Sequence, residues 1–458
     1  STLGNQDAVA LSAALPSGRD IFTLELAADG TRLAYTADQD TDQQQELYSV
    51  PTDASAAPVK LNGPLAPNQD VNLFHFTPDG TRVLFLVDYT TLWSVPADGS
   101  AAALQLASLV TDDLLPIAPD SSRVVFLSMG RVFSVPTDGS AGPVQLSGTA
   151  LGEQALSDYQ ITPDGARVIY RAWTFSLATG DPINWIFSVP IDGSAAPVLL
   201  FPPILDDQIG HSNPRVYVTA DSSRVVYRTE PTYSLLSAPV DGSSAAVRLD
   251  PAGGRVDQDC RLSADGRVVF RFAASGSDPA IHVVPADGSQ AAQRLTPFAG
   301  PIPIKWELAA TGWVVFDGYR DDRYELYGVP LAGGPTRRLS SPMVAGGGLV
   351  YGNAFFLESF IVTPDGRTVV YQADQDSDET FELHAVPTDG HASATRVNAS
   401  LVAGGDTSGF WVAPNSARLL YGADQSEDAR YELFTTILPD DSLEVESLGE
   451  IPSGMGIH

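Results

Sequence analysis

The sequence has little basic charge, a single cysteine and no long apolar segment, and each of these absences excludes a class of protein. Only Lys60 and Lys305 are lysines, and 26 basic residues stand against 56 acidic ones, for a formal net charge of −30. A nucleic-acid partner is not expected, because binding a polyanion requires a cationic surface. No stretch of about 20 residues is apolar and free of Gly and Pro, so we expect no membrane insertion. Cys260 stands alone, which excludes a disulfide within the chain.

What the sequence does contain is turn residues and an internal repeat. The 40 Gly and 34 Pro are spread along the whole chain, as many short strands joined by tight turns require. An apolar strand, a turn such as TPDG and a second apolar strand recur nine times. Neighbouring turns are 41 (Asp79 to Asp120) to 57 (Asp164 to Asp221) residues apart, a period typical of propeller blades of about 40–50 residues. The turns are anchored at Asp29, Asp79, Asp120, Asp164, Asp221, Asp265, Thr311, Asp365 and Asn415.

Each copy continues with a third strand that ends in a second turn, as in WSVPADGS and FSVPTDGS, and with a short fourth strand. Four antiparallel strands do not bury both of their faces alone, so each sheet must pack against its neighbours. The predicted fold class is therefore all-β: a single closed β-propeller of nine four-stranded blades that spans residues 1–458. The Arg that follows the first turn, such as Arg32 or Arg82, belongs to the repeat and is interpreted as structural.

Two segments are candidates for the strand that completes the last blade. Residues 7–13, DAVALSA, resemble a fourth strand that precedes the first blade, and we expect them to complete the last blade and join the two termini. The alternative is that residues 443–448 of the C-terminal tail supply this strand. Either arrangement removes an unprotected sheet edge.

The repeat resembles a known family. An apolar-PDG-x-x-apolar pattern with a downstream E-L-Y strand and a DG turn resembles the TolB-type propeller repeat, a relative of the WD repeat, over essentially the whole chain. Propellers of this type serve as periplasmic protein-binding platforms, as peptidase gates and occasionally as lyases. The resemblance thus implies the fold and a bacterial periplasmic, envelope or secreted location, and it leaves the function open.

Four connections between the second and third strands share an acidic pattern: ADQDTDQQQEL, DGYRDDRYEL, ADQDSDETFEL and ADQSEDARYEL. In each, an Asp stands eight and again four residues before a Glu. One interpretation is a solvated turn in which Asp bonds its own backbone. The other is calcium binding, since oxygen ligands at alternating positions suit a hard cation; no cofactor is otherwise required. The candidate ligands are Asp38, Asp40, Asp42, Asp317, Asp321, Asp374, Asp376, Asp378, Asp424 and Asp428.

The fourth copy has a long connection, RAWTFSLATGDPINWIF, that carries Trp173, Phe175 and Trp185. One interpretation is that this connection folds back as a local plug; the other is an exposed aromatic lip, which would anchor a peptide or stack on a sugar. No catalytic residues are identified. The sequence therefore favours a non-enzymatic, monomeric scaffold that binds a protein or peptide on the rim formed by these connections. The alternative is a carbohydrate- or ester-active enzyme, a lyase or hydrolase, with its site at the central channel.

Overall fold

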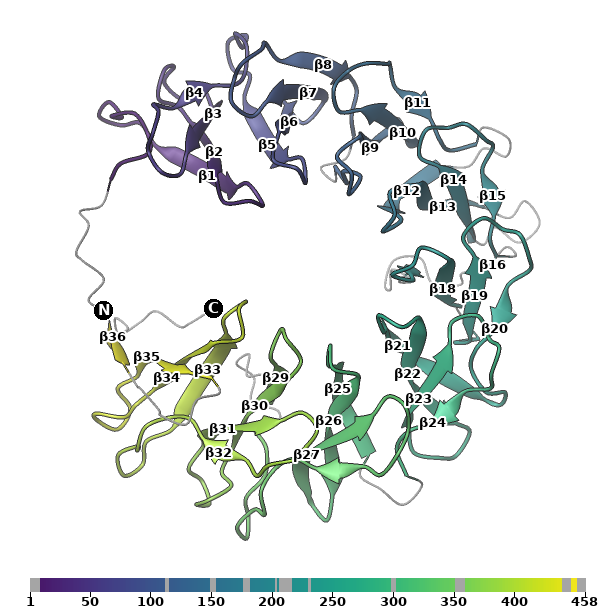
Figure 1. Cartoon of the computed structure of the whole chain (residues 1–458), viewed down its shortest axis with the longest axis vertical. Coiled ribbons are helices and arrows are strands. Elements are labelled where there is room, and N and C mark those ends of the chain that lie inside the picture. The colour runs from purple at the N-terminus through teal and green to yellow at the C-terminus, as the bar shows by residue number, and fades with distance from the viewer. Residues whose placement is uncertain are drawn as a thin grey trace. The chain divides into compact units, whose positions relative to one another are not determined.

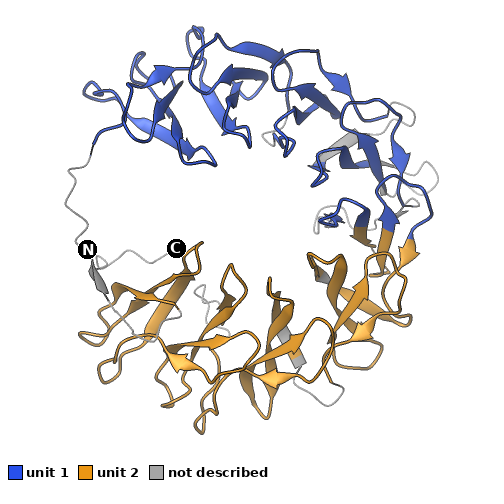
Figure 2. Cartoon of the chain, in the orientation of Figure 1, with its two compact units in different colours: residues 1–225, 238–246 blue, residues 226–237, 247–458 orange. Residues whose placement is uncertain are grey.

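The computed structural model describes residues 9–111, 115–148, 154–175, 182–201, 204–205, 216–229, 232–297, 302–350, 359–438 and 446–450. These residues form strands and turns without any helix, so none of them belongs to a helix able to cross a membrane. The chain divides into two compact units (Figure 2). The first unit comprises residues 1–225 and 238–246, and the second comprises residues 226–237 and 247–458.

The described strands make nine antiparallel sheets in chain order, numbered here sheet 1 to sheet 9 (Figure 1). Sheet 1 has strands β1 (Ile21–Leu26), β2 (Arg32–Ala37), β3 (Glu46–Pro51) and β4 (Val59–Lys60). Sheet 2 has β5 (Val71–Phe76), β6 (Arg82–Val87), β7 (Thr91–Pro96) and β8 (Leu104–Ala107). Sheet 3 has β9 (Arg123–Ser128), β10 (Arg131–Pro136) and β11 (Val144–Gln145). Sheet 4 has β12 (Gln154–Ile161), β13 (Arg167–Phe175), β14 (Pro182–Pro190), β15 (Val198–Leu199) and β16 (Ile204–Leu205).

The remaining five sheets have four strands each. Sheet 5 has β17 (Val216–Val218), β18 (Arg224–Arg228), β19 (Leu235–Pro239) and β20 (Val247–Arg248). Sheet 6 has β21 (Gly254–Leu262), β22 (Arg267–Ala274), β23 (Ala280–Pro285) and β24 (Gln293–Arg294). Sheet 7 has β25 (Ile302–Leu308), β26 (Trp313–Arg320), β27 (Arg323–Pro330) and β28 (Arg337–Arg338). Sheet 8 has β29 (Phe360–Val362), β30 (Thr368–Ala373), β31 (Glu382–Pro387) and β32 (Thr395–Arg396). Sheet 9 has β33 (Thr407–Val412), β34 (Arg418–Ala423), β35 (Glu432–Ile437) and β36 (Glu446–Glu450).

Two sheets differ from the predicted four strands. Sheet 3 has three, because the segment that would form its first strand contains Pro116, which has no N–H to donate to a sheet ladder. That segment keeps only the isolated bridge between Ile117 and Val124. Sheet 4 has five strands: β14 is nine residues long, and the part of it beyond its pairing with β15 pairs with β16.

The fourth strand of sheet 9 also differs from the favoured expectation. It is β36, from the C-terminal tail, and it pairs with β35. Residues 9–13 form no strand, and residues 7 and 8 lie outside the described residues. Leu11 instead packs on Tyr35 and Tyr48 of sheet 1. A hairpin with β35 closes a short loop, which costs less chain entropy than recruiting a segment more than about 400 residues away.

Consecutive sheets pack face to face within each unit. In the first unit, Leu47 of sheet 1 packs with Phe74 of sheet 2, and two further cores join sheets 2 and 3 and sheets 3 and 4. In the second unit, three similar cores join sheets 6 to 9 in series. This serial packing of small twisted sheets is the packing of propeller blades.

Cross-strand pairs recur inside the sheets and explain much of the repeat. An aromatic ring of the second strand stacks on a ring of the third, as Tyr35 does on Tyr48 at 5.4 Å. The Arg after the first turn donates from Nε to a Ser of the third strand, as Arg32 does to Ser49 at 3.0 Å. The structural interpretation of these arginines is thereby confirmed in sheets 1 to 4, where the other pairs are Arg82 with Ser94, Arg123 with Ser134, and Arg167 with Ser188.

Candidate functional site

A hollow of about 720 Å³ lies across the first strands of sheets 1 to 4, within the first unit. Its walls come from the ends of β1, β5 and β12 that lead into the PDG-type turns, and from residues 115–119 of sheet 3. Leucine, isoleucine and phenylalanine side chains line much of it, together with prolines of the turns. The proline positions are Pro78, Pro116, Pro119 and Pro163. The hollow is thus an apolar trough, within the usual size range of ligand sites of about 300–1,000 Å³.

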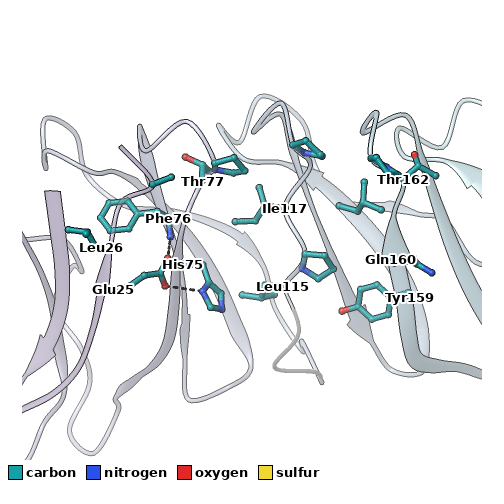
Figure 3. A pocket seen from close by; sticks show the side chains of 16 residues that line it. Glu25, Leu26, His75, Phe76, Thr77, Leu115, Ile117, Tyr159, Gln160 and Thr162 are labelled. Carbon is teal, nitrogen blue, oxygen red and sulfur yellow. Dashed lines mark hydrogen bonds and ion pairs between the residues drawn. The ribbon is translucent and has the colours of Figure 1, made fainter. Parts of the chain in front are cut away.

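One polar pair stands in this trough. Glu25 Oε2 lies 3.0 Å from His75 Nδ1, and Glu25 Oε1 accepts a 3.0 Å hydrogen bond from the backbone N–H of Phe76. Both side chains are partly exposed. Figure 3 shows the imidazole of His75 facing Tyr159 across the trough, with Leu115 between them. Glu25 therefore joins sheet 1 to sheet 2 and orients the His75 ring toward the space.

Sequence reasoning did not find this site. It placed His75 in an inner strand, and it placed the binding surface on the connections at the opposite ends of the first strands. The missed signal is that Glu25 and His75 both stand four residues before their turn Asp, at Asp29 and Asp79. Equivalent positions of neighbouring sheets face each other once the sheets pack.

The acidic connections have a structural core. The first Asp of each pattern is buried and accepts a backbone N–H from its own sheet, from a residue that lies before or within the first strand. Asp38 accepts from Asp20 at 2.7 Å, and Asp374 from Gly348 at 2.7 Å. The hydrogen bond from the backbone N–H of Asp20 is the main cause that lowers the pKa of Asp38. The corresponding buried residues are Asp38, Asp317, Asp374 and Asp424.

The other candidate aspartates of these connections are exposed. Asp42 pairs with Arg19 at 3.4 Å, and Asp40 with Lys60 at 3.4 Å. The remaining exposed residues are Asp321, Asp376, Asp378 and Asp428. Calcium binding by these groups stays a prediction, which a comparison of the melting temperature in excess Ca²⁺ and in EDTA tests.

The long connection of the fourth copy is an extended hairpin of β13 and β14. Trp173 and Phe175 lie on β13, where they pair in register with Asn184 and Pro182; their side chains and residues 176–181 lie outside the described part. The side chain of Trp185 is buried, with the residue 9% exposed. Trp185 therefore belongs to the packing of sheet 4 rather than to an exposed lip.

No protein-family model matches the sequence, and no curated protein matches it. Several solved structures are similar at low identity. The dipeptidyl peptidase 4 of Porphyromonas gingivalis shares 13% identity at a TM-score of 0.47, over 95% of this chain and 60% of the peptidase chain. The oligogalacturonate lyase of Vibrio parahaemolyticus shares 12% at 0.37, over 81% and 98%. A putative TolB of Agrobacterium tumefaciens shares 20% at 0.28, over 52% and 83%.

These similar structures include enzymes as well as a TolB, and this chain spans 60% of the length of the peptidase. At such identities a shared fold does not carry a shared function.

Proposed function

We propose that the protein is a non-enzymatic platform that binds an extended peptide, or a loop of a partner protein, in the trough across the first strands of sheets 1 to 4. The supporting observation is the trough itself: an open, proline-rich and mostly apolar surface with one polar pair, Glu25 and His75. Apolar side chains of a peptide would occupy the apolar walls, and a basic side chain would approach Glu25. The first strands are also the edges of sheets 1, 2 and 4, and an edge presents backbone hydrogen-bonding groups.

A peptide selection tests this proposal. A phage-displayed library of random 12-residue peptides is selected on the immobilised protein, and enriched peptides are synthesised with a fluorophore for anisotropy titrations. Ile117→Lys places a charge in the trough and should weaken binding by more than about 10-fold, the effect of 1.4 kcal/mol. The matched control is Val362→Lys, at the same position of the repeat in sheet 8, outside the trough. Equal loss in both variants, or no enrichment at all, would contradict the proposal.

The Glu25–His75 pair favours a second candidate function. A carboxylate that orients a histidine is a recurring arrangement for general base catalysis, and both side chains line the trough. A carbohydrate- or ester-active enzyme would then use His75 as its base. Hydrolysis of p-nitrophenyl acetate and elimination from polygalacturonate are the assays, with His75→Gln as the variant. Turnover that His75→Gln abolishes would favour the enzyme, whereas equal rates in both proteins would exclude it.

We also propose that the nine sheets close into one propeller. Leu24 and Leu26 of β1 are 67% and 54% exposed, whereas the equivalent Phe74 and Phe76 of β5 are 6% and 7% exposed against sheet 1. At the other end of the series, Trp411 of β33 is 43% exposed. Each terminal sheet thus presents one apolar face that no described residue covers fully, and closure would cover both. The loop-rich rim, including Trp173 and Phe175, stays a predicted second contact surface, and the envelope or secreted location stays a prediction.

A further inference from the structure

The third strand of sheet 8 carries a histidine at a position where sheets 1 and 7 carry tyrosine. His384 of β31 stacks on Tyr371 of β30 with ring centroids 5.3 Å apart. Tyr48 of sheet 1 and Tyr327 of sheet 7 occupy the equivalent place in their own stacked pairs. Sheet 8 therefore presents at this backbone position an imidazole in place of the phenol of sheets 1 and 7.

In sheet 1 the tyrosine and a lysine both bond a glutamate, and the lysine also pairs with an aspartate. The hydroxyl of Tyr48 donates to Glu46 Oε2 at 2.9 Å. Lys60 Nζ bonds Glu46 Oε1 and lies 3.4 Å from Asp40 Oδ2. In sheet 7 the hydroxyl of Tyr327 donates to Glu325 Oε2 at 2.6 Å. The phenol thus donates a hydrogen bond to the glutamate two residues before it on the third strand.

In sheet 8 an imidazole nitrogen takes the place of that donor. Asp376, Glu382 and His384 each offer one ligand atom, and these atoms lie within 4.8 Å of one another. His384 Nε2 is 3.5 Å from Asp376 Oδ2. The histidine is 1% exposed, and its Nδ1 has no hydrogen-bond partner among the described residues. The Nε2 atom of this buried ring makes a long contact with Asp376, inside the cluster.

We propose that Asp376, Glu382 and His384 bind one divalent first-row transition ion of the Zn²⁺ class. One imidazole and two carboxylates form a mixed nitrogen and oxygen donor set, which suits these ions better than Ca²⁺ or Mg²⁺. A tetrahedral Zn²⁺ with bonds of about 2.0–2.1 Å holds its ligands roughly 3.4 Å apart. The contact between His384 and Asp376 already has this length.

The neighbouring charges permit a cation. Arg396 Nη1 lies 2.8 Å from Glu382 Oε1, so the two carboxylates and this guanidinium together carry a net charge of −1. The chain as a whole carries −30. Sheet 6 offers a contrast, because His282 occupies the equivalent position but Ala280 stands where the glutamate would be. His282 should therefore bind no ion.

Cobalt is the probe for this site. The full-length protein, freed of metal with EDTA, is titrated with CoCl₂ in the presence of excess MgCl₂, which occupies weak acidic sites. One Co²⁺ per chain should bind with visible d–d absorption bands. His384→Tyr replaces the histidine with the side chain found in sheets 1 and 7. It should weaken Co²⁺ binding by more than about 10-fold, because losing a residue that only supports a metal ligand already costs about that much affinity. Asp376→Asn, on an exposed side chain, should weaken it as well without disturbing the fold.

The matched control is His282→Tyr, which should leave the cobalt spectrum and the affinity unchanged. ZnCl₂ should displace the bound Co²⁺ and raise the melting temperature of the wild type but not of His384→Tyr. Cobalt binding that survives both His384→Tyr and Asp376→Asn would overturn the proposal. So would the absence of saturable binding by the wild type.

Discussion

At the scale of single residues, three copies of the repeat have a serine where the others have the glycine of the first turn. The PDG-type turn needs a residue with positive φ, which is Gly in most copies, as at Gly80 with φ 69°. Ser222 takes that position with φ 58°, a conformation that costs an L-residue about 1–2 kcal/mol. Its hydroxyl accepts the backbone N–H of Asp164, from the turn of the preceding sheet, at 2.9 Å. Ser121 and Ser416 make the same bond to the preceding turn.

The serine therefore combines an unfavourable backbone conformation with a favourable hydrogen bond between sheets. Two substitutions measure these two effects separately. Ser222→Ala keeps the strain and loses the bond, so we expect a loss of about 1–2 kcal/mol in the free energy of unfolding. Ser222→Gly loses the bond but relieves the strain, so it should stay within about 1 kcal/mol of the wild type. Urea unfolding followed by circular dichroism measures both. A glycine variant less stable than the alanine variant would refute this explanation.

The turn aspartates predict an acid limit to stability. Hydrogen bonds from hydroxyl or N–H groups two positions away in sequence lower the pKa of many of them. A carboxyl whose pKa is lower in the folded chain stabilises the fold above its unfolded pKa of about 3.9. That contribution disappears as the pH falls through the folded pKa. The residues concerned are Asp29, Asp53, Asp98, Asp120, Asp138, Asp192, Asp221, Asp241, Asp365 and Asp389.

We therefore expect the melting temperature to fall steeply below about pH 4, because many such groups act together. Thermal melts between pH 7 and pH 2.5 measure this dependence. A melting temperature that stays constant down to pH 2.5 would show that these bonds do not stabilise the folded state.

At the scale of elements, the acidic connection is a structural unit used three times in one conformation. In residues 38–46, 374–382 and 424–432, the buried Asp accepts the N–H of the residue five positions on. That residue has positive φ in each case: Gln43 at 57°, Glu379 at 62° and Ala429 at 64°. The connection thus holds its shape by backbone hydrogen bonds to a carboxylate.

This conformation makes Ala429 a site for stabilisation. Ala429→Gly removes the strain of positive φ, but glycine also adds conformational entropy to the unfolded chain. The net effect should be a rise of about 0.5–1 kcal/mol in the free energy of unfolding. Ala392 is an exposed turn residue without positive φ, so Ala392→Gly should be neutral or destabilising. Denaturant melts of the two variants compare them. An increase in stability for both, or for neither, would contradict the argument.

The sequence predicted the elements well where the signal is local. The TPDG and VPxDG turns mark strand ends by backbone chemistry, so nine sheets follow from the repeat. Sheet 3 has one strand fewer because of Pro116, and this local signal could have predicted the difference. The trough and the Asp376, Glu382 and His384 cluster could not be predicted in the same way. They depend on which faces of different strands meet, as when Glu25 reaches His75 and Phe76.

At the scale of the whole molecule, we propose that nine sheets form one closed propeller and that its first four sheets carry a peptide-binding trough. Closure would cover the exposed faces that carry Leu24 and Trp411. Burial of such apolar surface contributes about 25 cal/mol per Å². In an open series of sheets, both faces would be exposed to water in the single chain. A second copy of the chain would then bind and cover them.

Cross-linking tests closure most directly. Leu24→Cys and Trp411→Cys are combined in one chain, whose natural Cys260 is buried, and the protein is treated with a short bismaleimide at low concentration. We predict a cross-link within single chains, identified by mass spectrometry of the joined peptides, that neither single-cysteine variant forms. Cross-linked dimers, or two cysteines that each react with separate reagent molecules, would contradict a closed nine-sheet propeller.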